Sequence, residues 1–106
     1  VRNLVVQLPG VVRRKVLRAS SKSVADVDLF VPHQANLRIN EFVARKLEIP
    51  AEKVVTTIDR YGNTTAASIP ISLSEAWAEG RAKPGALVLF AAFGSGYTWG
   101  AGLVRM

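Results

Sequence analysis

Apolar and polar residues recur with two different periods along the chain, and the period predicts where helices and strands lie. Apolar positions three and four residues apart predict three helices, at 1–19, 34–47 and 64–79. Short, mostly apolar runs predict four strands, at 26–31, 54–58, 86–92 and 97–104. This order predicts an α/β fold whose first strands are parallel and whose last two are antiparallel. The run at 86–92 has no polar position, which predicts burial on both faces.

Prolines, threonines and a glycine predict how these helices begin and end. Pro9 lies inside the first pattern, so either that helix kinks or a second helix starts near Pro9. Thr64 or Thr65 is expected to cap the third helix, and Gly80 to close it. The first half of that helix, at 66–71, is small and apolar on nearly all sides, which predicts a buried helix.

Polar turns interrupt the apolar pattern at three places. The strand at 26–31 is followed by His33, the only histidine of the chain. Asn63 follows thirty residues later and also precedes a helix. Sites in open α/β sheets form beyond the carboxyl ends of strands, so both side chains are expected in one crevice. A third turn, at 93–97, links the last two strands and contains Ser95 between two glycines.

A neutral imidazole and an amide can both act as N–H donors. Two donors that converge on one oxygen stabilise negative charge there, as decarboxylation of a malonyl thioester requires. The backbone N–H groups of the third turn would provide a second oxyanion site. From the pattern alone the alternatives stay open: a structural histidine, an ordinary turn at Asn63 and an ordinary hairpin at 94–96.

Composition and charge narrow the classes of partner. The 106 residues predict a single domain over 1–106, and a 49% hydrophobic content predicts an apolar face meant for a partner. The net charge of +6 fits an acidic protein partner or a solvated basic surface. Nucleic acid is disfavoured because the aromatic residues are not interleaved with the basic ones and no nucleic-acid motif occurs.

The residue types that are missing narrow the chemistry further. Because the chain has no cysteine, it contains no disulfide framework, no thiolate metal site and no cysteine nucleophile. The longest apolar run is too short to cross a membrane, and residues 1–8 do not resemble a signal peptide. We therefore expect a cytoplasmic protein, and the first residue, which is not methionine, leads us to expect an excised or processed piece.

The motifs around the three turns resemble those of the β-ketoacyl-ACP synthase III family. Residues 31–39 resemble its histidine motif, residues 61–70 its asparagine motif, and residues 83–100 its C-terminal end. The resemblance is strong from Asp28 onward and loose over 1–23. It implies the C-terminal half of a thiolase-like layered fold, with a mixed sheet and helices on both faces.

The resemblance also implies roles for single residues. His33 and Asn63 match two members of a Cys-His-Asn triad whose cysteine lies in an N-terminal half that is absent here. The backbone N–H of Ser95 matches an oxyanion-hole position. Asn36 matches a contact to the pantetheine arm, and Arg38 a residue of the carrier-protein docking surface.

The implied reaction is the decarboxylative Claisen condensation of malonyl-ACP with an acyl group from acyl-CoA, in fatty-acid initiation and without a cofactor. The implied partners are an acyl carrier protein, the missing N-terminal half and a second copy in a homodimer, and this chain alone is expected to be inactive. Two alternatives remain: a related acyltransferase that loads starters in polyketide or other secondary metabolism, and a non-catalytic, free-standing binding module.

Overall fold

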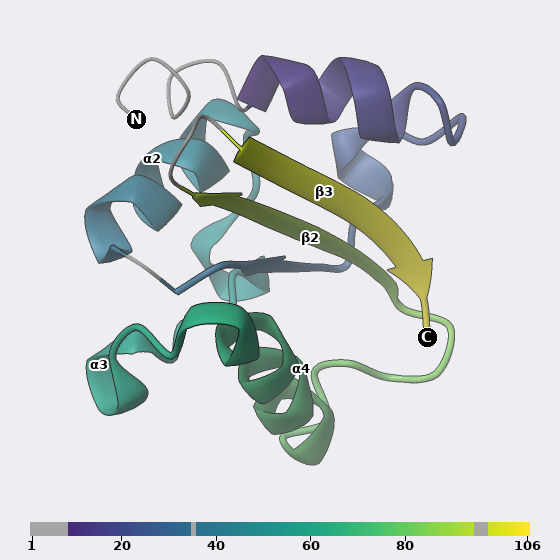
Figure 1. The fold of residues 1–106 in the computed structure, drawn as a ribbon. Coiled ribbons are helices and arrows are strands. Elements are labelled where there is room, and N and C mark those ends of the chain that lie inside the picture. Colours follow the sequence, from purple (N-terminus) through teal and green to yellow (C-terminus); the bar gives the residue numbers. More distant parts are fainter. Residues whose placement is uncertain (1–8, 35, 95–97) are drawn as a thin grey trace.

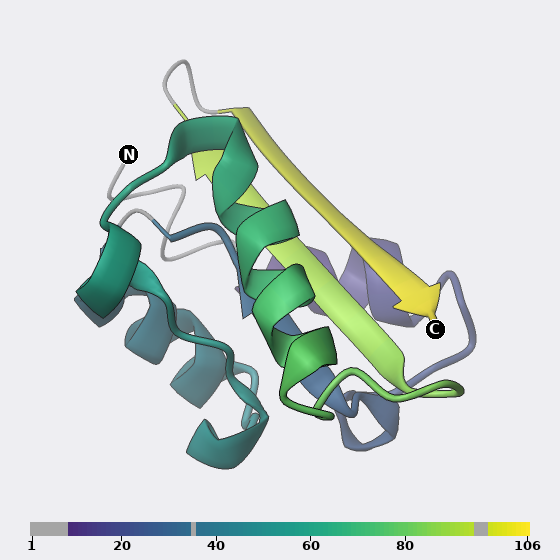
Figure 2. The same cartoon turned by 90° about the horizontal axis from the view of Figure 1, so that it is seen from below.

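The computed structural model describes residues 9–34, 36–94 and 98–106. Its sheet has the order β1-β2-β3 and lies between helices on both faces (Figures 1 and 2). Strand β1 (Leu29–Pro32) is parallel to β2 (Leu87–Gly94), and β3 (Thr98–Arg105) is antiparallel to β2. The α/β class, the mixed sheet and the antiparallel last pair are therefore confirmed.

The helices of the described residues follow the predicted order, with short helical turns added between them. They are η1 (Val12–Leu17), η2 (Val24–Asp26), α2 (Leu37–Lys46), η3 (Ala51–Lys53), α3 (Ile58–Tyr61), η4 (Thr65–Ala67) and α4 (Ser68–Ala78). Residues 9–11 are already helical and continue into η1, whose turns are π-helical. Residues 1–8 lie outside the described residues, so the two alternatives, a kink at Pro9 and a second helix that starts near it, both stay predictions.

The core has two parts, one on each face of the sheet. Phe30 packs with η1 and α2, whereas its neighbours Leu29 and Val31 pack with α4 on the opposite face. Strand β2 alternates in the same way, because Leu89 belongs to the first cluster and Val88 to the second. The prediction of a strand buried on both faces is confirmed, and its physical reason is the two-residue period of side chains along a strand.

The predicted strand at 54–58 is wrong beyond its first residue. Val54 forms an isolated parallel bridge with Phe30, after which the chain leaves the sheet and enters α3. The backbone N–H groups of Thr57 and Ile58 donate to a side chain, the amide of Gln34, and not to a neighbouring strand. A tertiary contact thus overrides the β propensity of this segment.

The start of α4 also differs from the prediction. Neither Thr64 nor Thr65 makes a side-chain cap, and a short turn of 3-10 helix, η4, precedes α4. The prediction that 66–71 is buried on nearly all sides is wrong for this chain, because Ala66, Ala67 and Pro70 are exposed and only one side of α4 packs on the sheet. The end agrees with the prediction, since Gly80 follows the helix with a φ of 77°.

Gln34, which the sequence interpretation did not single out, joins the end of β1 to the segment that leads to the second turn. Its side chain is fully buried. The amide nitrogen donates to the carbonyl groups of Pro32 and Val55, at 2.9 and 3.2 Å. The amide oxygen accepts from the N–H groups of Thr57 and Ile58, at 3.0 and 3.1 Å. One side chain therefore satisfies four backbone groups from two separate segments. Without it these groups would be buried without a hydrogen-bond partner, which is costly.

Gln34→Ala should lower the free energy of unfolding by about 3 kcal/mol, because it leaves buried backbone groups without partners. Gln34→Glu is the matched variant of the same shape. Its carboxylate can accept from both N–H groups but opposes two carbonyl oxygens, so this variant should be destabilised at neutral pH. It should regain stability as the pH falls, because a protonated carboxyl donates again. Urea unfolding at neutral and acidic pH measures both effects, and a Gln34→Glu protein as stable as the parent at neutral pH would contradict this role.

Gly62 provides a second test, since it has φ 67° and ψ −157°, a conformation that is essentially restricted to glycine. Gly62→Ala should therefore cost about 1–3 kcal/mol of stability, although no neighbouring atom blocks the added Cβ. Gly100→Ala is the control, because Gly100 has open space and no positive φ. Thermal unfolding of the two variants compares them, and equal melting temperatures would show that the backbone at Gly62 is not strained by a side chain.

Candidate active site

The first turn follows the carboxyl end of β1, at the end of the sheet where β2 also ends. The backbone N–H of His33 donates to the carbonyl of Ala91 in β2 at 2.8 Å. Figures 1 and 2 show the segment between α3 and α4 at this same end of the sheet. The first two polar turns therefore lie at the same end of the sheet, although the second follows α3 and not the predicted strand at 54–58.

The His33 side chain is half-buried and lies against the start of α4. Its Nδ1 atom is 2.5 Å from Oγ of Ser68, a side chain that is itself buried. Burial lowers the pKa of His33, because the charged imidazolium loses solvation. Among the described residues no carboxylate forms an ion pair with His33. The imidazole is therefore neutral near neutral pH, which agrees with the donor chemistry that the sequence suggested.

Asn63 lies exposed in the second turn, and its own backbone neighbourhood orients its side chain. The Oδ1 atom accepts from the N–H of Thr65 at 2.8 Å. Because the carbonyl end of the amide is engaged, the NH₂ group is left as the donor toward a ligand. The turn is held on both sides, through Gln34 before it and through Ser68 after it.

Asn36 has a structural role that the sequence interpretation did not predict. It is the N-cap of α2, and its Oδ1 accepts from the N–H groups of Arg38 at 2.9 Å and Ile39 at 3.4 Å. Capping of this kind satisfies N–H groups at a helix start and occupies only the carbonyl end of the amide. Arg38 is exposed on the first turn of the same helix.

The centre of the third turn, residues 95–97, lies outside the described residues. It includes Ser95, whose predicted backbone donor stays a prediction. The nearest described pair, Gly94 and Thr98, lies at the end where β2 and β3 pair.

The side chains that sequence reasoning missed form a line along the buried side of α4. Ser68, Ser72 and Ala76 are spaced four residues apart and are buried. Ser72 Oγ lies 2.9 Å from Oγ1 of Thr57, in the segment that Gln34 also binds. The sequence does contain a sign of this line, namely two serines spaced four residues apart in α4. Two hydroxyls on one side of a helix predict buried partners elsewhere, because a buried hydroxyl requires a hydrogen bond.

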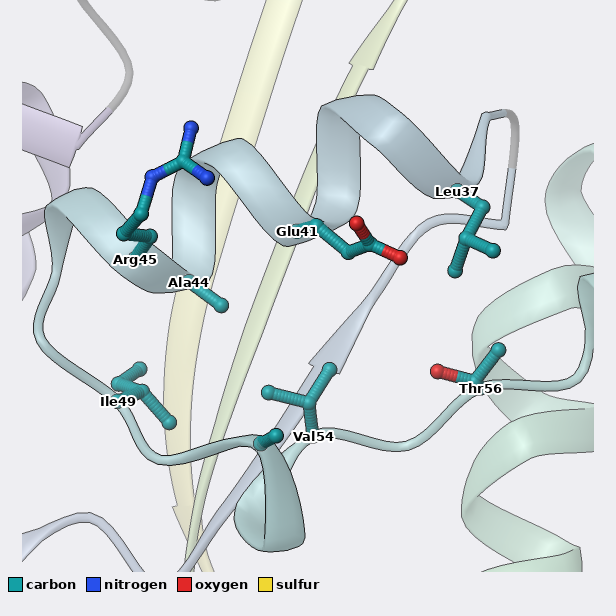
Figure 3. A pocket seen from close by; sticks show the side chains of 8 residues that line it. Leu37, Glu41, Ala44, Arg45, Ile49, Val54 and Thr56 are labelled. Atoms are coloured by element: carbon teal, nitrogen blue, oxygen red, sulfur yellow. The ribbon is translucent and has the colours of Figure 1, made fainter.

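A separate cavity of about 470 Å³ lies between α2 and the segment 49–56 (Figure 3). Its apolar wall includes Ala44, Ile49 and Val54, and Glu41 and Arg45 project from α2 beside it. None of the residues that we predicted for the site lines this cavity. It is therefore distinct from the turn around His33.

Two further classes of site find no support in the described part of the chain. Its His, Asp and Glu residues form no group of three that could hold a metal ion. None of its helices has the length and apolar character needed to cross a membrane.

Comparison with known proteins gives the same result for the family model, for curated relatives and for solved structures. The model of the family described as 3-oxoacyl-[acyl-carrier-protein (ACP)] synthase III C terminal matches residues 17–106. The beta-ketoacyl-[acyl-carrier-protein] synthase III of Erythrobacter litoralis (strain HTCC2594) is 52% identical over 104 residues, which are 98% of this chain and 32% of that relative.

Two solved structures extend the comparison to the fold. The 3-oxoacyl-[acyl-carrier-protein] synthase III from Aquifex aeolicus VF5 matches with a TM-score of 0.91 and 50% identity, over 96% of this chain and 33% of that one. The priming beta-ketosynthase from the R1128 polyketide biosynthetic pathway matches with a TM-score of 0.85 and 30% identity, over 97% and 31%.

The chain thus spans about a third of the length of these relatives. The matched residues include both polar turns, the helices that follow them and the last two strands. The chain belongs to the 3-oxoacyl-[acyl-carrier-protein] synthase III family and corresponds to its C-terminal part.

Proposed function

We propose that the protein carrying this chain is a β-ketoacyl-ACP synthase III, which condenses malonyl-ACP with an acyl group from acyl-CoA at the start of fatty-acid synthesis. The observation that carries this proposal is a neutral His33, set against α4 and located at the same end of the sheet as the Asn63 turn. The family membership and the 52% identity to a named synthase support the same activity.

The proposed reaction begins in the half of the protein that this chain lacks. A cysteine thiolate there takes the acyl group from acyl-CoA and forms a thioester, and CoA leaves as the thiol. Malonyl-ACP then loses CO₂, and the electron pair of the broken C–C bond moves onto the thioester oxygen as an enolate. Nε2–H of His33 and the NH₂ of Asn63 donate to that oxygen while the charge develops.

The carbanion carbon of the enolate then attacks the carbonyl of the acyl-enzyme. The tetrahedral oxyanion is stabilised by the backbone N–H of Ser95 together with a donor from the missing half, and its collapse releases the cysteine thiolate and β-ketoacyl-ACP. The proposed scheme needs no cofactor, because the negative charge develops on oxygen atoms and N–H donors stabilise it in both steps. This chain alone lacks the nucleophile, so it is expected to be inactive without the N-terminal half.

The proposed partners follow from the charge and from the first turn of α2. An acyl carrier protein is acidic, which suits a chain of net charge +6 with Arg38 exposed near the site. The NH₂ of Asn36 is available to the pantetheine arm, since only its Oδ1 is used in capping. On family resemblance we also expect a cytoplasmic homodimer.

A second candidate is a starter-loading enzyme of polyketide or other secondary metabolism, favoured by the match to the R1128 priming ketosynthase at 30% identity. The higher identity, 50–52%, to proteins named beta-ketoacyl- or 3-oxoacyl-[acyl-carrier-protein] synthase III favours the first candidate. Acyl-CoA profiling of the full-length protein separates them, because the two classes accept different starters.

His33→Ala and Asn63→Ala should each lower malonyl decarboxylation by about 10²–10³-fold, since each removes one donor to the enolate oxygen. Formation of the acyl-enzyme from acyl-CoA is the internal control and should continue, because it does not use these donors in the proposed scheme. Release of CO₂ and acylation of the full-length protein are measured separately. Near-normal CO₂ release by His33→Ala would refute the proposed role.

Arg38→Glu should raise the KM for malonyl-ACP about tenfold at low ionic strength, an effect that salt reduces because exposed charges are screened. The KM for malonyl-CoA should stay unchanged. Lys83→Glu makes the same change of charge in the turn before β2, at the opposite end of that strand, and should leave both values as in the parent. Equal effects of the two variants would show that overall charge, and not a docking position, is responsible.

A further inference from the structure

The Ser68 hydroxyl at the start of α4 contacts two neighbouring residues of the first turn. Its Oγ lies 2.5 Å from Nδ1 of His33 and accepts from the backbone N–H of Gln34 at 3.2 Å. The side chain is only 1% exposed, so water cannot replace either partner. This hydroxyl therefore has a fixed set of partners within the protein.

Those partners determine which atom donates in the contact with His33. The N–H of Gln34 can only donate, so it uses one lone pair of the Ser68 oxygen. If Nδ1–H of His33 also donated to that oxygen, the Ser68 proton would need another acceptor. Among the described residues the Ser68 hydroxyl is hydrogen-bonded only to Nδ1 of His33 and to the N–H of Gln34, so Nδ1 is the one acceptor that it has. A buried donor without a partner is costly, so the satisfied arrangement has Ser68 O–H donating to Nδ1 of His33.

The imidazole that accepts at Nδ1 carries its single proton on the other nitrogen. We propose that Ser68 is a positioning residue that holds neutral His33 in the tautomer with the proton on Nε2, the donor needed at the enolate oxygen. The catalytic importance of this tautomer rests on the proposed function. The tautomer itself is a property of the folded chain and can be observed without turnover.

Several features of the site act in the same direction. The backbone N–H of His33 donates to the carbonyl of Ala91 in β2, which fixes the backbone position from which the ring reaches Ser68. Burial keeps the imidazole neutral, so the choice between tautomers matters. A carboxylate in place of Ser68 would instead favour the imidazolium, whereas a hydroxyl fixes the tautomer without adding charge.

The test compares Ser68→Ala with Ser72→Ala in the full-length protein. Both changes remove a buried hydroxyl from the same side of α4, but Ser72 bonds to Thr57 and does not contact His33. Histidine labelled with ¹⁵N reports the tautomer directly, and the His33 signals are identified by their loss in His33→Asn. In the parent protein and in Ser72→Ala, Nε2 should appear protonated and Nδ1 unprotonated.

In Ser68→Ala the His33 signals should show a mixture of both tautomers, and the turnover number for malonyl decarboxylation should fall about fivefold, the equivalent of one neutral hydrogen bond. The KM for malonyl-ACP should stay unchanged, because Ser68 is buried behind His33 and binds no substrate. Loss of stability in both serine variants with loss of turnover in Ser68→Ala alone would support positioning.

Two results would overturn the inference. A parent protein with the proton on Nδ1 excludes the proposed bond even if Ser68→Ala does not fold. A Ser68→Ala protein with the parent's tautomer and turnover shows that Ser68 does not position His33. The spectrum needs no turnover, so failure of the proposed reaction would be a separate result from failure of this inference.

Discussion

The fully buried amide of Gln34 is the contact on which the arrangement of the two polar turns depends. It binds backbone groups on both sides of a gap where the sheet has only a single bridge, at Val54. A further strand at 54–58 would have satisfied these backbone groups by hydrogen bonds to a neighbouring strand. The chain would then have continued in the sheet and not turned into α3. Binding to a side chain lets the chain turn into α3 and bring the Asn63 turn back to the end of β1.

The described residues of the two turns provide neutral donors, and His33 and Asn63 take part in no ion pair there. Ser68 contacts His33, Thr65 engages the carbonyl end of Asn63, and burial disfavours the imidazolium. Neutral donors held in place suit a reaction in which negative charge appears only transiently, because they need little reorganisation when it develops. The cost of this design is a set of buried hydroxyl and amide groups that must all be satisfied, which explains why Ser72 is paired with Thr57 as well.

The large apolar side chains that the described residues expose lie on several elements. Trp77 on α4 is half-exposed, and Trp99 and Val104 on β3 are exposed as well. The high hydrophobic content led us to expect an apolar face meant for a partner. Trp99 and Val104 lie on opposite faces of β3, because side chains alternate along a strand, so these residues do not form one face and the partner surface stays a prediction.

The sequence alone determined the α/β class, the antiparallel last pair of strands, the burial of β2 on both faces and the placement of His33 directly after β1. These follow from local periodicity, from turn residues and from the rule that parallel strands end at one edge. Sequence did not reveal that 54–58 leaves the sheet, that Thr64 and Thr65 do not cap α4, or that Gln34 and Ser68 hold the two turns together. Whereas Thr65 is engaged locally by Asn63 and by the carbonyl of Thr64, the course of 54–58 and the link between the two turns depend on hydrogen bonds between residues more than twenty positions apart. No local pattern records such a bond, so only the tertiary structure decided it.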